Sequence, residues 1–151
     1  MKTYFKDLFS YDHWANERLL ATLRTNHIEH EHIIKIMSHL VSAQLIWLHR
    51  IQDLPVSPFP LWESYKISEL ESMVEESSIR WIKFLEECKI TTFEEVVQYH
   101  NTKGQHFEST IKEIITHVLY HSMHHRGQVS RLMRESGIDP PLNDYIIYKR
   151  H

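Results

Sequence analysis

The segment from residue 117 to residue 128 reads HVLYHSMHHRGQ, and four of its twelve residues are histidines. The apolar spacing around it is typical of a buried helix, whose inward stripe passes from Val118 through His121 and His125 to Val129. Residues four apart differ by about 40° around a helix, so these two imidazoles project together. Two such histidines are a recognised way to bind one metal ion, although the same pair would also suit a hydrogen-bonded core or a solvated stripe near a bundle end.

A third histidine strengthens the metal-binding hypothesis. His39 lies beside the apolar stripe of an earlier segment, between Ile36 and Ala43, and would face the pair at 121 and 125 if the two helices pack together. Three neutral imidazoles leave a coordination position open, as in catalytic metal sites, where the ion acidifies water or stabilises a thiolate. Zinc or nickel is the expected ion, and iron or copper would also suit these ligands. Ser122 stands where His-Glu-x-x-His would need its glutamate, so a zincin protease mechanism has no support.

The other histidines have simpler interpretations. His117 continues the row of histidines and His124 lies on its flank. His49 falls outside the apolar stripe and is expected at the surface. The histidines of the segment NHIEHEH, residues 26–32, are expected to form a solvated helix start.

Two polar residues occupy an apolar stripe in the first helical segment. Asp12 and Asn16 fall between Phe9 and Leu19, where a bundle is normally apolar. A buried carboxylate needs a partner. Asp12 would either accept the N–H of a metal-bound imidazole and fix its tautomer, or lie at the bundle edge or pair with Arg18 or Arg126; the sequence leaves both interpretations open.

Four amphipathic helices would position these residues. The first runs from about Lys2 to Arg24, and the second follows a capping pair, Asn26 with Glu29, and ends near Asp53. The third opens with a capping box, Ser68 with Glu71, and the fourth runs from Thr110, paired with Glu113, to about Ser136. The pattern predicts an all-α four-helix bundle. Its second connection, which contains three prolines in LPVSPFPLWESYKI, is long enough to cross the bundle.

The stretch 93–109 breaks the helical pattern and predicts a small β-hairpin between the third and fourth helices, turning at Asn101-Thr102-Lys103-Gly104.

Composition narrows the class of protein. The 151 residues are expected to form one domain, 1–151. Their net charge of −3 gives no positive electrostatic field that would attract nucleic acid. No apolar run approaches the roughly 20 residues of a membrane helix. The N-terminal residues lack an uninterrupted apolar signal core, so export is not expected. The single cysteine, Cys88, fits a reducing cytoplasm and lies on an apolar stripe, where a buried structural thiol is the commoner case.

Several segments together resemble one known family. YDHWANERLL at 11–20, SHLVSAQLIWLHR at 38–50, HVLYHSMHHRGQVSRLMRESGIDPP at 117–141 and NDYIIY at 143–148 are similar to the DinB/YfiT-like superfamily, in order and over nearly the whole chain. The H-x-x-x-HHRGQ element is the most specific of these. The stretch from Leu54 to about Ser109 matches mainly in layout.

The resemblance implies a fold, a metal and a class of reaction. Members are four-helix bundles, often homodimeric, that carry a divalent metal on three histidines, which by motif position would be His39, His121 and His125. Characterised relatives include transferases that use low-molecular-weight thiols (bacillithiol, mycothiol or glutathione) and a thiol-dependent isomerase, while many members have no assigned reaction. The signature also includes Arg126, Gly127 and Gln128. Gly127 would allow close helix packing, and the other two would either bind an anionic co-substrate or tie the fourth helix to its neighbours.

The leading hypothesis is therefore a cytoplasmic, metal-dependent thiol S-transferase acting on a small molecule in stress or detoxification, with Asp12, Asn16, Arg126 and Gln128 as residues that support the ligands. One alternative is a hydrolase that uses metal-bound hydroxide, with Asp12 as the only candidate base. The other is a non-catalytic metal-binding bundle that serves as a dimeric binding module, for which a closed fourth ligand such as Asp12 or His117 would be the indication. Phe59 and Trp62, in the proline-rich connection, would line a pocket or an interface.

Overall fold

Four long helices dominate the structure, a computed structural model that describes residues 1–150. They are α1 (Lys2–Thr25), α2 (Glu31–Ile51), α3 (Ile67–Glu87) and α4 (Ile111–Glu135). A short 3-10 helix, η1 (Ile90–Glu94), and an antiparallel hairpin, β1 (Val96–His100) with β2 (His106–Thr110), connect α3 to α4, and the short helix α5 (Tyr145–Tyr148) follows α4. The predicted helical bundle with a small hairpin is confirmed.

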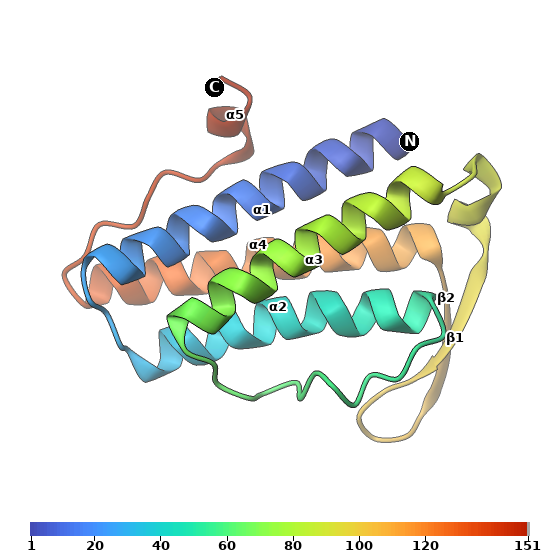
Figure 1. The fold of residues 1–151 in the computed structure, drawn as a ribbon, viewed down its shortest axis with the longest axis horizontal. Coiled ribbons are helices and arrows are strands. Elements are labelled where there is room, and N and C mark those ends of the chain that lie inside the picture. The colour runs from blue at the N-terminus through green and yellow to red at the C-terminus, as the bar shows by residue number, and fades with distance from the viewer. Residues whose placement is uncertain (151) are drawn as a thin grey trace.

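The long connection between α2 and α3 sets the topology. Residues 52–66 run back along the outside of the bundle, so α3 starts at the same end as α2 and runs parallel to it, while α1 and α4 run the other way (Figure 1). In this arrangement α1 packs against α3, and α2 packs against α4. The last pairing matters for function because it brings the helix that carries His39 against the helix that carries His121 and His125.

The helix starts agree with the sequence patterns only in part. The capping box at α4 is confirmed: Thr110 Oγ1 accepts from the Glu113 N–H (3.2 Å), and Glu113 Oε2 accepts from the Thr110 N–H (2.8 Å). The predicted box at Ser68 is wrong, because α3 starts earlier and Glu69 accepts the N–H of Lys66 (2.7 Å).

The predicted cap of α2 is also wrong. The Asn26 side chain donates back to the Thr22 carbonyl (2.8 Å) and so closes the end of α1, and a turn with His27 at φ 52° follows. The N-cap of α2 is His30, whose Nδ1 accepts from Ile33 N (3.4 Å). The end of α1 and the start of α2 lie within a few residues of each other, so Asn26 could cap either helix, and it caps the end of α1.

The core has two apolar ends with a polar layer between them. One end is built around Phe9 and Trp81, whose rings stack at 4.6 Å, and the other around Leu19 and Val129. Between these ends the four long helices contribute buried polar side chains, namely Asp12, Asn16, Gln44, Ser77, Ser122 and Arg126. The polar residues on the predicted apolar stripes are thus collected at one level of the bundle.

Within residues 1–150, no helix is both long and apolar enough to cross a membrane.

Candidate metal centre

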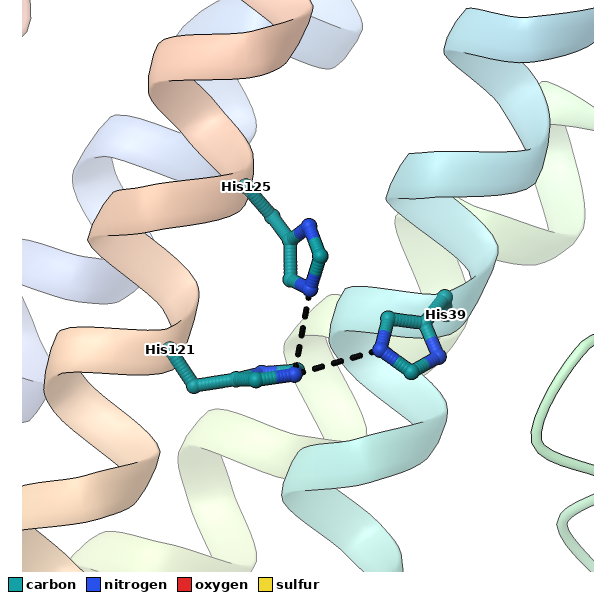
Figure 2. A group of neighbouring side chains, drawn as sticks. All are labelled: His39, His121 and His125. Carbon is teal, nitrogen blue, oxygen red and sulfur yellow. Dashed lines mark hydrogen bonds between the residues drawn. The ribbon is translucent and has the colours of Figure 1, made fainter.

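Three histidines from two helices converge on one point. His39 of α2 lies opposite His121 and His125 of α4, and all three rings turn an Nε2 atom inward (Figure 2). The Nε2 of His121 lies 3.1 Å from that of His39 and 3.1 Å from that of His125. One nitrogen from each ring lies within 4.8 Å of the others, so the group could hold a metal ion.

The outer nitrogens of two rings are fixed by hydrogen bonds. The Nδ1–H of His39 donates to the Leu61 carbonyl (3.0 Å), and the Nδ1–H of His125 donates to Gln128 Oε1 (2.7 Å). A neutral imidazole carries one proton, so both rings present an unprotonated Nε2 to the centre. Bonds of this kind orient metal-binding histidines and raise their basicity.

The proton count shows that the three residues fit a cation. With the Nε2 atoms of His39 and His125 both acceptors, only His121 can supply a hydrogen, and it can direct it well toward one neighbour at a time. At least one Nε2 lone pair then faces a nitrogen atom that donates no hydrogen bond to it. A divalent ion would satisfy all three lone pairs at once, and imidazole nitrogen is a common ligand of zinc, nickel, iron and copper.

Burial keeps these imidazoles in the form that binds metal. It lowers the pKa of His121 to about 3, and the neighbouring histidines add to the effect. Burial is also the largest cause that lowers the pKa of His39 and of His125. At neutral pH all three rings are therefore uncharged, and a neutral imidazole is the form that binds a metal.

The histidine group opens onto a cavity of about 620 Å³. His39 and His121 form part of its wall, together with further residues of α2. The hairpin contributes residues on one side, and the 52–66 connection contributes Val56, Phe59 and Leu61 on another. A small molecule in this cavity would therefore meet the open side of the histidine group.

The two aromatic residues of the connection have different positions. Phe59 lines the cavity, and Trp62 stacks on the ring of His39, with centroids 3.9 Å apart and planes inclined by 8°. One face of the Trp62 ring therefore covers His39, while the residue remains 55% exposed.

Comparison with known proteins agrees with this architecture. The model of the DinB family matches residues 1–151. The chain belongs to the DinB family. The curated Protein DinB of Bacillus subtilis (strain 168) is 25% identical over 165 residues, which cover 98% of this chain and 95% of that protein.

The residues that the sequence offered as supports divide into two groups in this DinB-family chain. Gln128 contacts a histidine of the centre directly, through His125. Asp12, Asn16 and Arg126 instead bond one another: Arg126 donates to Asp12 Oδ1 and to Asn16 Oδ1 (3.1 Å), and Asn16 donates to Asp12 Oδ2 (3.0 Å). Of the two interpretations of Asp12, the structure therefore shows the pairing with Arg126, between α1 and α4.

A buried amide that the sequence did not single out organises this network. Gln44 donates to Asp12 Oδ2 (2.6 Å) and to Ser122 Oγ (2.8 Å), and it accepts from Ser77 Oγ (2.8 Å). It thereby links all four long helices, and its partner Ser122 is the residue after His121. The available signal was a glutamine among buried neighbours in SHLVSAQLIW, whose meaning depends on partners distant in sequence.

Two other sequence predictions are wrong. His49 is buried, and its Nδ1 bonds to the Pro55 carbonyl (2.6 Å), because the crossover connection folds over this end of α2. Gly127 does not serve close packing, since a Cβ atom there would meet nothing within 4 Å. Of the three histidines predicted to form a solvated helix start, His27 and His32 are exposed, and His30 is half-buried as the N-cap of α2.

Proposed function

We propose that this protein is a metal-dependent enzyme that activates the thiol of a small co-substrate and transfers its sulfur to an electrophile. The observation that carries the proposal is the convergence of three Nε2 atoms beside a cavity of about 620 Å³, whose wall includes His39 and His121. Zinc or nickel is the expected ion, with iron or copper as alternatives.

The division of labour follows from the contacts. A divalent ion held by His39, His121 and His125 would supply a Lewis-acid position that favours loss of the proton from a thiol at neutral pH. The Leu61 carbonyl and Gln128 hold two of the rings in place. In the transfer, the thiol proton passes to solvent, the sulfur forms a bond to the electrophilic atom, and the leaving group departs with the electron pair of the broken bond.

The protein's own thiol is a poor nucleophile for this reaction. Cys88 is buried at the end of α3, and burial raises the pKa of its thiol. A buried, protonated thiol reacts slowly, which supports a thiol brought in by the co-substrate.

Two competing functions fit the contacts less well. A hydrolase needs a general base near the ion, and the one carboxylate suggested for that role, Asp12, is bonded to Arg126, Asn16 and Gln44. A purely structural metal would favour a fourth protein ligand. The His117 ring instead packs edge-on against Trp47, with centroids 5.3 Å apart, and the candidate group of His39, His121 and His125 offers three ligand atoms.

The proposal includes a small-molecule substrate, a homodimeric assembly and a cytoplasmic location. The first two are what the resemblance stated above implies, and a single buried cysteine is compatible with a reducing compartment. Light scattering after size-exclusion chromatography tests the dimer.

The first experiment is elemental analysis of protein purified without a nickel column and dialysed against fresh buffer. Wild type and His32→Ala, a change of the same type at an exposed histidine, should each hold one divalent ion per chain, and His121→Ala should lose it. The loaded protein is then assayed for conjugation of bacillithiol, mycothiol, glutathione or cysteine to 1-chloro-2,4-dinitrobenzene.

A metal-dependent rate with one of these thiols, absent in His121→Ala, would support transfer. No ion in wild-type protein, with no rise in melting temperature on adding zinc or nickel, would refute the metal site. A bound ion with no conjugation, but with cleavage of a test ester, would favour the hydrolase.

A further inference from the structure

The cavity beside the histidine group contains an arginine that the proposed chemistry does not use. Arg50, on the last turn of α2, lines the same cavity as His39 and His121. Its guanidinium lies over the ring of Trp47 (4.5 Å to the centroid) and near that of Tyr99 (5.3 Å). These two rings, which are themselves 4.9 Å apart, hold the cation at the junction of α2 and the hairpin.

The charge of Arg50 is not neutralised by a neighbouring acid. Its Nη2 donates to the carbonyl of His100 (3.1 Å), and among residues 1–150 no carboxylate lies within ion-pair distance of it. Burial lowers the pKa of Arg50, yet a guanidinium remains protonated in proteins. A half-buried guanidinium that contacts two aromatic rings and one carbonyl still lacks an anionic partner.

The rest of the cavity wall also favours an anionic ligand. In the part of the chain that the structure describes, no aspartate or glutamate lines the cavity, and besides Arg50 its ionisable side chains are three imidazoles and the Tyr99 phenol. Apolar side chains fill much of the remaining wall, including Ile46, Val56 and Phe59. A ligand with an anionic end and an apolar body would suit both parts of this surface.

The spacing along α2 places the cation at a distance from the metal centre. His39 and Arg50 are eleven residues apart, which brings them to nearly the same face of the helix, three turns from one another. The guanidinium leans back over Trp47, which is eight residues from His39, or about 12 Å along the axis. An anion at Arg50 would therefore belong to an extended molecule whose reacting atom lies near the histidines.

We propose that Arg50 binds a carboxylate of the substrate, and that this enzyme acts on a carboxylate-bearing thiol or electrophile rather than on a neutral one. A guanidinium offers paired N–H donors that match a carboxylate, and charge-assisted bonds of this kind are about twice as strong as neutral ones. The inference rests on the proposed function for the identity of the reaction, but the binding of a carboxylate can be tested apart from it.

The binding test uses a matched pair of unreactive probes, 4-phenylbutyrate and its neutral amide, 4-phenylbutanamide. Their Kd values would be measured by NMR from the indole N–H signal of Trp47, which lies in the cavity wall. Wild-type protein should bind the acid more tightly than the amide. Arg50→Gln should weaken binding of the acid about tenfold and leave the Kd of the amide within about twofold.

Two control variants separate the alternatives. Arg131→Gln removes an arginine whose partner is the exposed Glu135, and should change neither Kd. His121→Ala removes a ligand of the metal centre but not the cation, and should retain the preference for the acid. Loss of that preference in His121→Ala instead of Arg50→Gln would place the carboxylate on the metal and overturn the inference.

Two further results would also overturn it. Equal weakening of acid and amide in Arg50→Gln would show that Arg50 only shapes the hairpin. Equal binding of the two probes by wild-type protein would show that the cavity does not select an anion.

The activity test determines which reactant carries the carboxylate. The thiols 3-mercaptopropionate and its methyl ester are compared first, then the electrophiles iodoacetate and iodoacetamide. For one of the two pairs, wild-type kcat/KM should favour the charged member, and Arg50→Gln should remove that preference. If no thiol is transferred at all, the proposed function fails, while the Kd values still decide whether Arg50 binds a carboxylate. If transfer occurs with no preference in either pair, the inference about the substrate is refuted.

Discussion

The network around Asp12 allows a prediction of large magnitude. The carboxylate accepts from three side chains, with Arg126 on Oδ1 and with Asn16 and Gln44 on Oδ2. Asp12 and Arg126 are 3% and 4% exposed, so solvent cannot replace what either loses. In Asp12→Asn the new amide keeps one acceptor oxygen, its NH2 group faces at least one donor, and the guanidinium loses its counter-charge.

The expected cost follows from this geometry. Removing one partner of a buried ion pair typically costs about 3–5 kcal/mol. For a chain of this size each kcal/mol lowers the melting temperature by about 2–4 °C, so Asp12→Asn should melt roughly 6–20 °C below wild type. Because the total stability of a domain is about 5–15 kcal/mol, a loss of this size should leave the variant folded at low temperature.

The measurement is urea unfolding of metal-free protein, followed by circular dichroism, so that metal binding does not contribute to the free energy of unfolding. Glu135→Gln is the control, because it breaks the exposed pair with Arg131 and should cost less than about 1 kcal/mol. The double variant Asp12→Asn with Arg126→Gln should cost less than the sum of the single changes, since the unpaired guanidinium is gone.

One pattern of results would refute this reasoning. If Asp12→Asn changed the free energy of unfolding by less than about 1 kcal/mol while strongly weakening metal binding, Asp12 would act on a ligand of the ion. The structure predicts the opposite order of effects, because the carboxylate bonds to α1, α2 and α4 side chains rather than to the imidazoles.

Four further predictions concern the centre and its helix. Gln128→Leu should weaken metal binding about 10–100-fold, measured by competition with a chromophoric chelator, because His125 loses the acceptor of its Nδ1–H. The melting temperature of metal-free wild type should fall as pH falls below about 6.5. The pKa of His121 is about 3 in the folded protein, so the unfolded chain binds the proton first and is favoured as the pH falls. His121→Leu should weaken this pH dependence. Nickel or copper should quench tryptophan fluorescence mainly through Trp62, which stacks on His39 at 3.9 Å, so Trp62→Phe should remove most of the quench. Gly127→Ala should raise the free energy of unfolding by about 1 kcal/mol, measured in urea, since a helical Cβ there meets open space.

Each of these has a contradicting outcome. Unchanged metal affinity in Gln128→Leu would mean that the amide does not orient His125. A pH dependence identical in wild type and His121→Leu would assign the lost stability to other groups. A full quench in Trp62→Phe would locate the ion near another tryptophan, and a destabilised Gly127→Ala would indicate a contact with a second chain.

The sequence determined the elements of this protein and the residue types of its candidate metal centre. Apolar periodicity specifies the long helices because burial of one face depends on residues three and four apart, and the hairpin around Asn101–Gly104 depends on equally local turn chemistry. The pairing of His121 with His125 is local for the same reason. His39 was suggested as the third member by its place beside an apolar stripe, and the resemblance to the DinB family implied the same residue.

The tertiary structure decided what depends on partners distant along the chain. Asp12 and Arg126 are 114 residues apart, so their pairing could be suggested but not selected from the sequence, and the role of Gln44 depends on side chains of three other helices. The burial of His49 and the cavity beside the histidines both follow from the path of residues 52–66, where prolines prevent a regular pattern. Local spacing sets which face a side chain occupies, but only the packing of helices and connections sets what that face meets.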